Sequence, residues 1–343
     1  MIKIRLITAA LLLSFWVAAA SQAIAADAQV NIYSARKEVL IKPLFDAFTA
    51  ETGIVVNLVS AKADALLQRL EREGANSPAD VFLTTDAGRL AKAKQLDLLQ
   101  PVSSELLDAA IPAQYRDPDG AWYGLSIRAR PIIYAVDRVK PAELSSYLAL
   151  AGPDWKNRIC VRSSSNIYNQ SMLAAFIHHR GAELTEDWAR GLVANFARKP
   201  QGGDTDQIRA VAAGECDVAL ANTYYLARLT VSAKPADRET AAKVAIFWPD
   251  QDGFGVHVNI SGAGVTRAAG HVAEAVALLE YLAGPEAQRN YAEVVHEYPV
   301  RTDVAWSDVV SAWGRFVADD LSLAVLGDNN AEALRIADRA GWR

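Results

Sequence analysis

The segment VNIYSARKEVLIKPLFDAFTAETGIVVNLV, residues 30–59, carries the pattern that decides the fold. It begins and ends with short apolar runs that have the length and composition of β-strands. Between these runs, Leu40, Leu44 and Phe48 recur at helical spacing, and Gly53 follows as a residue that commonly ends a helix. The segment therefore predicts a strand, an amphipathic helix and a second, buried strand in succession.

The same alternation extends along the rest of the chain. A helical pattern over residues 63–73 precedes an apolar run at 81–84, and strands and helices alternate again over residues 159–221. Such alternation predicts two α/β units, each with a sheet covered by helices. The β-rich stretches 124–134 and 255–262 fall between these units, so we expect them to cross from one lobe to the other and to form a hinge.

Length and charge exclude several classes of protein. The chain has 343 residues, 51% of them hydrophobic, which is enough for two packed domains and excludes wholesale disorder. Its 35 basic and 40 acidic side chains give a net charge of −5 without a long basic run, which argues against a nucleic-acid surface. The sequence has no short repeat and no second long apolar segment, which disfavours a coiled coil, a fibre or a multi-spanning membrane protein.

Residues 1–25 have the features of a secretory signal peptide. Lys3 and Arg5 precede an apolar stretch at residues 6–20, and Ala23-Ile24-Ala25 fits a cleavage site with small residues. An uncleaved membrane anchor is the alternative interpretation, but the apolar run is short for a membrane span. We therefore expect a secreted chain that loses this segment.

Cys160 and Cys216 are the two cysteines of the sequence, and both lie in the part that we expect to be secreted. An even number of cysteines in an oxidising compartment indicates a disulfide, whereas two separate buried thiols are the alternative. Each cysteine adjoins a strand-like segment, and neighbouring strands would bring the two sulfurs within bonding reach. We therefore favour a bond between Cys160 and Cys216.

A cluster of tyrosines follows the predicted strands of the second lobe. Tyr224 and Tyr225 come directly after the strand at residues 217–221, and Tyr168 follows the strand at residues 159–162 after a short turn. Side chains in a turn that enters a helix can converge on one point. A ligand site is one interpretation of the cluster. Aromatic rings packed at the rim of the lobe, with hydrogen-bonded hydroxyls, are the other.

Five segments of the sequence form a pattern that is shared with a known family. They are Tyr33-Ser34-Ala35-Arg36, Ser77-Pro78-Ala79-Asp80-Val81, Arg128-Ala129-Arg130, residues 162–170 and Asn222-Thr223-Tyr224-Tyr225. In this order and spacing they resemble the periplasmic ferric-iron-binding proteins of bacterial ABC importers. The tyrosine pair together with Ser-Ser-Ser-Asn-Ile-Tyr, which ends at Tyr168, is the specific part of the resemblance.

The resemblance implies the two-lobe periplasmic binding protein fold of type II, with a mixed β-sheet flanked by helices in each lobe and a two-strand hinge. We expect a signal peptide at residues 1–25, an N-terminal lobe at 26–127 and 255–305, and a C-terminal lobe at 128–254 and 306–343. The family also implies that Fe³⁺ is held in the cleft between the lobes. A monomeric periplasmic protein of this kind would deliver the ion to an inner-membrane ABC permease.

By resemblance, Tyr168, Tyr224 and Tyr225 are the metal ligands of the second lobe. The chemistry of these residues agrees, because Fe³⁺ favours anionic oxygen and three phenolates would balance its charge. A free tyrosine has a pKa near ~10, so metal binding must displace protons. A zinc or manganese site would be expected to contain histidines and carboxylates instead.

The first lobe departs from the family's pattern. Family members often place a His-Tyr pair directly after the arginine that corresponds to Arg36, and here that pair is Lys37-Glu38. One alternative is that Glu38 supplies a carboxylate ligand, and the other, which we prefer, is that a small anion such as carbonate completes the site. Arg36 and Arg128 match positions that contact such an anion or the phenolates in relatives. Arg130 could exchange roles with Arg128, and Lys37 would favour negative charge.

Two other functions are compatible with the same residues. The chain could bind an organic or oxyanion solute through its arginines, with the tyrosines as hydrogen-bond donors, or it could be a secreted metal-dependent enzyme. The sequence contains no Gly-x-Ser-x-Gly or phosphate-loop motif and no evident general base near the tyrosines, which disfavours the enzyme. We therefore expect a binding protein that is not an enzyme and has no nucleic-acid partner.

Overall fold

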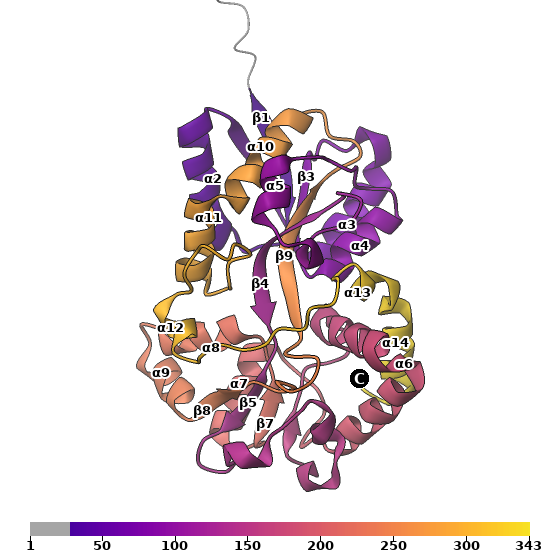
Figure 1. Cartoon of the computed structure of the whole chain (residues 1–343), viewed down its shortest axis with the longest axis vertical. Coiled ribbons are helices and arrows are strands. Elements are labelled where there is room, and N and C mark those ends of the chain that lie inside the picture. The colour runs from indigo at the N-terminus through magenta and orange to yellow at the C-terminus, as the bar shows by residue number, and fades with distance from the viewer. Residues whose placement is uncertain (1–27) are drawn as a thin grey trace, which may run out of the picture.

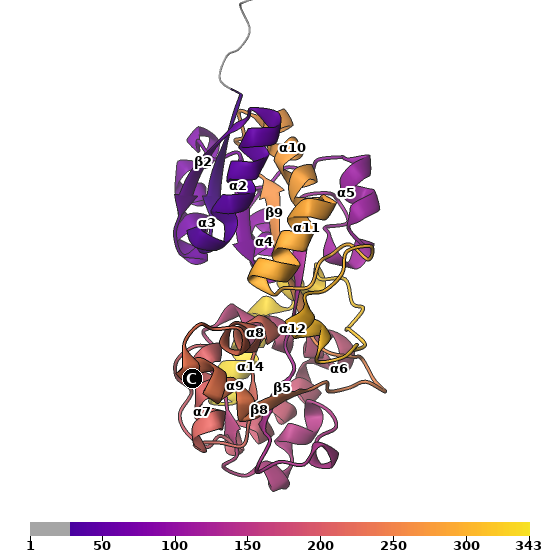
Figure 2. The same ribbon diagram turned by 90° about the vertical axis from the view of Figure 1, so that its left-hand side faces the viewer.

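The computed structural model describes residues 28–343, which form two lobes stacked along the long axis of the molecule (Figures 1 and 2). Each lobe contains one mixed β-sheet with helices around it. This arrangement confirms the predicted two-lobe α/β fold. The predicted signal peptide, residues 1–25, lies outside the described residues. In the part of the chain that the structure describes, no helix is both long and apolar enough to cross a membrane.

The first lobe is built on a five-stranded sheet with the strand order β2-β1-β3-β9-β4. Its strands are β1 Gln29–Ser34, β2 Val55–Ser60, β3 Val81–Thr85, β4 Tyr123–Ala129 and β9 Val258–Val265. The helices around it are α2 Glu38–Thr52, α3 Ala63–Glu73, α4 Ala87–Gln95, α5 Glu105–Ala110, α10 Val272–Ala283 and α11 Pro285–Asn290. Strand β1 pairs in parallel with β2 and β3, as the alternation of strands and helices predicts, whereas β9 runs antiparallel to β3 and β4.

Helix α2 forms as its apolar spacing predicts. Ile41, Leu44 and Phe48 are buried on one face of the helix. Gly53 ends the helix with a φ of 77°, where its N–H donates to the carbonyl of Thr49. Glycine adopts this left-handed conformation without steric cost, so the helix stops at the residue where the sequence places its end.

Strand β2 is exposed, which differs from the prediction of a buried strand. It lies at the edge of the first sheet, and Val55 and Val59 are 48% and 37% exposed. A run of β-branched residues suits an edge strand as well as a central one, because strand propensity reflects packing on the sheet surface. The apolar run therefore predicted the strand correctly but not its place in the sheet.

Strands β4 and β9 connect the two lobes. They pair as antiparallel neighbours up to Arg128 opposite Asn259 and Ala129 opposite Val258. After Ala129 the chain enters the second sheet, and it returns from the second lobe just before Val258. Figure 1 shows the two strands running together from the first lobe toward the second. A third connection follows Tyr298, which pairs with β4 through backbone hydrogen bonds before the chain enters the second lobe again.

The second lobe is built on a four-stranded sheet with the strand order β6-β7-β5-β8. Its strands are β5 Ile132–Ala135, β6 Ile159–Cys160, β7 Val218–Leu220 and β8 Val244–Phe247. The helices around it are α6 Ile167–Ala194, α7 Asp204–Ala213, α8 Thr223–Thr230, α9 Pro235–Ala242, α12 Asp308–Ser311 and α14 Asn330–Arg339. Helix α6 consists of two helical parts on either side of a non-helical residue. The interruption is at Gly181, whose φ of 82° and ψ of 166° are not helical.

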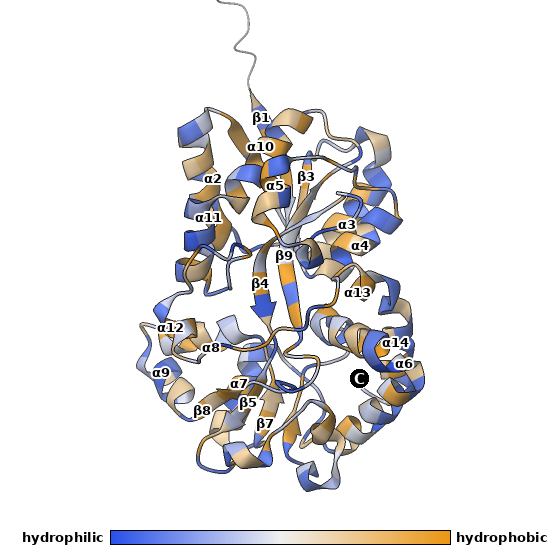
Figure 3. Ribbon diagram, in the orientation of Figure 1, coloured by the Kyte–Doolittle hydropathy of each residue, from blue (hydrophilic) through white to orange (hydrophobic). Residues whose placement is uncertain are grey.

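The C-terminal part of the chain packs against both lobes. Helix α13, Val325–Asp328, contacts α4 of the first lobe and α6 of the second. Trp342 is fully buried, and its indole Nε1–H donates to the carbonyl of Arg162 at 3.0 Å, while its own carbonyl accepts from Ser164. These two contacts fix the loop that leads into α6. Figure 3 shows hydrophobic residues along much of β9, which lies inside the molecule.

A disulfide joins Cys160 at the end of β6 to Cys216 just before β7. The two Cα atoms are 5.9 Å apart, and the cysteines are 56 positions apart in the chain. Both sulfur-bearing residues are buried in a cluster with Ile133 and Val211. The bond therefore links the two parallel strands from which the tyrosine-bearing loops emerge.

Removal of this disulfide should destabilise the second lobe. Because the bond restricts a long loop in the unfolded chain, the Cys160→Ala/Cys216→Ala variant should lose about 2–4 kcal/mol of unfolding free energy. Denaturant unfolding of the two proteins, each with and without reductant, measures this. Reductant should lower the midpoint of the parent protein only, and equal midpoints for parent and variant would contradict the expectation.

Candidate metal centre

The three tyrosines meet at the starts of two helices. Tyr168 lies in the first turn of α6, where its N–H donates to the side chain of the N-cap residue Asn166 at 3.0 Å. Tyr224 and Tyr225 lie in the first turn of α8, and their ring centroids are 4.3 Å apart. The hydroxyl of Tyr224 is 3.4 Å from that of Tyr168. The structure therefore brings together the residues that the sequence selected.

These tyrosines line a cavity of about 150 Å³ between the lobes, here called the tyrosine pocket. Its first-lobe wall comes from the loop after β1, from α2 and from β3, and its second-lobe wall comes from α6 and α8. Strand β4 and the segment after α11 contribute one residue each. The lining residues are Ala35, Arg36, Lys37, Leu40, Thr85, Arg128, Tyr168, Tyr224, Tyr225, Arg228 and Glu297.

Arg128 lies at the centre of the pocket and is 3% exposed. Its Nη2 donates to the hydroxyl of Tyr168 at 2.8 Å and also to the hydroxyl of Tyr224. Its guanidinium carbon is 4.7 Å and 4.8 Å from the centroids of the same two rings. On its other side, Nε is 3.6 Å from the carboxylate of Glu297. Arg128 therefore joins the tyrosines to an acidic group at the hinge.

Glu297 is the buried carboxylate of this pocket, and the sequence analysis missed it. It accepts from Arg36 at 2.8 Å and 3.0 Å, and from the hydroxyls of Ser126 and Ser261. Burial opposes its ionisation, but the charges of Arg36 and Arg128 and the hydrogen bond from Ser126 outweigh burial and lower the pKa of Glu297 to about 2. The available signal was a charged residue inside the apolar segment that follows the last helix of the first lobe.

The structure places Glu38 away from the tyrosines, which argues against its role as their carboxylate partner. Glu38 is the first residue of α2, is exposed, and lines a separate groove of about 290 Å³ beside β2. Lys37 is exposed but does line the tyrosine pocket. The sequence also did not single out Arg228, whose guanidinium carbon is 4.9 Å from the ring centroid of Tyr224.

Arg130 does not lie beside the tyrosine hydroxyls as Arg128 does. The structure therefore argues against the exchange of roles that the sequence left open. Strand β4 ends at Ala129, so the strict alternation of side chains stops before Arg130. Its side chain is buried in the second lobe, where it pairs with Asp204 at 2.9 Å and donates to Asn169 at 2.8 Å and to Asn222 at 3.0 Å. Asn169 follows Tyr168, and Asn222 is the N-cap residue of α8.

Asp204 completes a buried clamp beneath the tyrosines. It is fully buried, pairs with both Arg130 and Arg162, and accepts the N–H of Asn222 at 2.8 Å. Asp204 is also the first residue of α7. The clamp therefore ties together the starts of α6, α7 and α8, and it holds the tyrosine-bearing turns through groups that do not line the pocket.

The pocket contains several buried donors that form no hydrogen bond. Arg36 Nη2 and Arg128 Nε and Nη1 are buried and form no hydrogen bond within residues 28–343. Helices α6 and α8 also point their positive ends toward this place. Buried donors of this kind favour negatively charged oxygen. Residues 28–343 contain no group of three or more His, Cys, Asp and Glu that could hold a metal, so phenol oxygens are the main candidates for ligands here.

The tyrosines differ in how their surroundings affect ionisation. Burial opposes ionisation of Tyr168, but the charge of Arg128 and hydrogen bonds from Tyr224 and Arg128 outweigh it and lower the pKa to about 8. Burial raises the pKa of Tyr224 well above its ordinary value, despite the opposing charge of Arg128, and Tyr168 and Tyr225 raise it further. Burial, together with Tyr168 and Asp204, raises the pKa of Tyr225 to about 12. Tyr168 therefore ionises at a lower pH than Tyr224 and Tyr225.

Comparison with known proteins identifies the class to which this fold and site belong. Residues 43–318 match the family described as bacterial extracellular solute-binding protein, and the chain belongs to this family. This agrees with the resemblance found in the sequence.

Particular relatives are similar over most of the chain. Iron uptake protein A1 of Synechocystis is 48% identical over 315 residues, which cover 92% of this chain and 88% of that protein. A Trichodesmium protein, IdiA or FutA, in complex with iron and citrate is 50% identical with a TM-score of 0.89, and the match covers 92% of this chain and all of that one. The ferric binding protein of Campylobacter jejuni is 39% identical with a TM-score of 0.88, and the match again covers 92% of this chain and all of that one.

Tyr168 should be the first tyrosine to ionise in the metal-free protein. Its pKa in the folded state, about 8, lies below the ordinary value of ~10. Ionisation of Tyr168 therefore adds to the unfolding free energy. This contribution is complete above pH ~10 and is lost as the pH falls through about 8. Tyrosinate absorption should show a transition near pH 8 in the parent protein and in Tyr281→Phe, but not in Tyr168→Phe. A transition that persists in Tyr168→Phe would contradict this assignment.

Asp204→Asn should destabilise the protein strongly. It leaves Arg130 and Arg162 without their buried carboxylate, and the loss of one partner of a buried pair costs about 3–5 kcal/mol. Denaturant unfolding measures the change, and Asp64→Asn, which removes an exposed partner of Arg89, serves as the control. We expect no resolvable effect of the control. An Asp204→Asn variant as stable as the control would show that the clamp does not hold the turns.

Proposed function

We propose that this chain is a periplasmic binding protein that captures Fe³⁺ with the phenolate oxygens of Tyr168, Tyr224 and Tyr225 and delivers it to an inner-membrane ABC permease. The observation that carries the proposal is the convergence of these three tyrosines beside Arg128 in a pocket between two lobes. Relatives named as iron uptake and Fe³⁺-binding periplasmic proteins support the choice of ion.

The charges of the pocket support a trivalent cation with an accompanying anion. Three phenolates balance Fe³⁺. The other charged residues that line the pocket leave three positive charges, since Glu297 offsets one of Arg36, Lys37, Arg128 and Arg228. A small oxyanion would offset part of that charge and accept from the buried arginine donors that form no hydrogen bond, Arg36 Nη2 and Arg128 Nη1. Carbonate has the required size, and the relative from Trichodesmium holds citrate with its iron.

Binding requires that the phenols lose their protons. Arg128 lowers the pKa of Tyr168, so this residue supplies the first phenolate, and the charge of the ion then favours ionisation of the other two. Iron uptake therefore releases protons and weakens as the pH falls. Reduction to Fe²⁺ or protonation of the tyrosines would assist release, because both remove part of the attraction between the ion and the phenolates.

Closure of the lobes would complete the site. Arg36 and Lys37 come from the first lobe and the tyrosines from the second, so only the closed arrangement brings them to one pocket. Away from the pocket, Ser171 of α6 donates to Asp86 of the first lobe at 2.6 Å. This contact links the helix that carries Tyr168 to the opposite lobe. The permease would then recognise the closed form.

An oxyanion solute without iron is the second candidate, and the unpartnered arginine donors favour it. The family is one of solute-binding proteins, so a binding role agrees with both candidates and neither requires an enzyme. Titration with bicarbonate or citrate in the absence of iron distinguishes them. Tight binding of the anion alone, together with no uptake of iron, would favour the second candidate.

Tyr224→Phe should abolish most of the iron affinity. Ferric phenolate absorbs visible light, so the parent protein should become coloured on addition of ferric iron, and the variant should lose most of this band. Loss of a ligand should weaken binding by about 100-fold or more, since even the loss of a residue that supports a ligand costs 10–100-fold. Tyr281→Phe, at a separate groove of the first lobe, is the matched control. Full colour and affinity in Tyr224→Phe would overturn the ligand assignment.

A further inference from the structure

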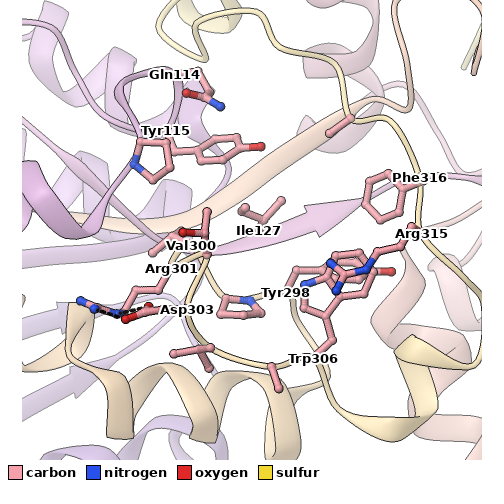
Figure 4. A pocket seen from close by; sticks show the side chains of 16 residues that line it. Gln114, Tyr115, Ile127, Tyr298, Val300, Arg301, Asp303, Trp306, Arg315 and Phe316 are labelled. Atoms are coloured by element: carbon pink, nitrogen blue, oxygen red, sulfur yellow. Dashed lines mark hydrogen bonds and ion pairs between the residues drawn. The ribbon is translucent and has the colours of Figure 1, made fainter.

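A second cavity lies behind the hinge and has a volume of about 410 Å³ (Figure 4). We call it the hinge pocket. Its walls come from the loop at residues 112–115, from Ile127 of β4, and from the segments 298–306 and 315–318. Cavities of about this size hold small organic molecules in many proteins. Thr302, Asp303 and Arg315 are exposed at its rim, so the pocket opens to solvent.

The hinge pocket lies on the opposite face of β4 from the tyrosine pocket. Side chains alternate along a strand, and Ile127 stands between Ser126, which donates to Glu297, and Arg128, which donates to the tyrosines. The side chains of the segment that pairs with Ile127 also alternate between the two pockets. Glu297 faces the tyrosine pocket, whereas its neighbour Tyr298 lines the hinge pocket. One pair of hinge segments therefore contributes to both cavities.

Aromatic rings form much of the wall of the hinge pocket. The ring centroid of Tyr298 is 4.7 Å from that of Trp306 and 5.3 Å from that of Phe316. Figure 4 shows these rings grouped at one end of the cavity, with Tyr115 and Ile127 toward the other end. These rings meet at interplanar angles of 72° and 71°, and an aromatic wall of this kind favours an aromatic ligand, because edge-to-face contacts add to the burial of apolar area.

One charged side chain that lines the hinge pocket, Arg315, has no ion-pair partner among the described residues. Arg301 is paired with Asp303 at 2.6 Å, at the end of the cavity away from the aromatic rings (Figure 4). Arg315 lies over the ring of Trp306, 4.4 Å from its centroid, and has no carboxylate within ion-pair distance among residues 28–343. A guanidinium that is already held against an aromatic ring keeps its edge free for a planar carboxylate.

We propose that the hinge pocket binds a small aromatic carboxylate, with its ring against Trp306 and Phe316 and its carboxylate on Arg315. The pocket contains residues of both lobes and of the hinge, so its shape depends on the angle between the lobes. Tyr298 and Ile127 exchange backbone hydrogen bonds of 2.7 Å and 2.9 Å, which transmits any displacement of Tyr298 to β4. A ligand there therefore changes the affinity of the tyrosine pocket.

Calorimetric titration of the iron-free secreted chain with 1-naphthoate tests the site itself. We expect saturable 1:1 binding, weakened about tenfold or more in Arg315→Gln, because a hydrogen bond to a charged group is lost. Arg289→Gln, a change at an exposed arginine of α11, should leave the affinity unchanged. The neutral probe 1-naphthamide should bind more weakly than 1-naphthoate. Absence of saturation, or equal affinity of parent and Arg315→Gln, would overturn the proposal.

A second titration tests the coupling between the hinge pocket and the tyrosine pocket. This coupling rests on the proposed function, the binding of Fe³⁺. The affinity of 1-naphthoate is measured with and without Fe³⁺, and the affinity of Fe³⁺ with and without saturating 1-naphthoate. Linkage requires both ratios to be the same, and coupling of this kind is typically about fivefold or more. Equal affinities in both pairs would overturn the coupling. If the chain takes up no iron, the proposed function fails, whereas the first titration still decides whether the site exists.

Discussion

The buried positive charge of Arg128 is the constraint on which the tyrosine pocket depends. A guanidinium that is 3% exposed requires anionic or strongly polar partners, because water no longer solvates it. Glu297 supplies part of this compensation but shares its charge with Arg36. The remaining compensation comes from the hydroxyls of Tyr168 and Tyr224. The same charge that needs partners therefore favours phenolate, which is the form of tyrosine that a ferric ion requires.

Two arginines at the end of the first hinge strand have separate tasks. Arg128 is the last strand residue but one and faces the pocket, whereas Arg130 lies beyond the strand and pairs with Asp204 inside the second lobe. Arg128 thus acts on the ionisation of the tyrosines, and Arg130 acts on their position. A single break in the strand, after Ala129, separates the two tasks. It also marks the place where the chain passes from one lobe to the other.

Local patterns predicted more of this molecule than long-range contacts did. The three tyrosines follow strands that the sequence shows clearly, and each cysteine adjoins one of the same two strands, so their positions could be predicted from local patterns. Glu297 could not be found in this way, because its partner Arg36 is 261 positions away. The role of Arg130 could not be predicted because it depends on the residue at which β4 stops. Strand β2 was predicted as a strand but not as an edge, since its composition suits both positions.

The contact of Trp342 with Arg162 has a consequence for the order in which the molecule matures. The two residues are 180 positions apart, and contacts of such separation form late because the intervening chain must be organised first. The loop before α6 therefore reaches its final shape only when the last helix has docked. A chain whose last helix has not docked therefore lacks the final shape of the loop that presents Tyr168, and a fusion tag placed beside Arg343 would lie next to that loop.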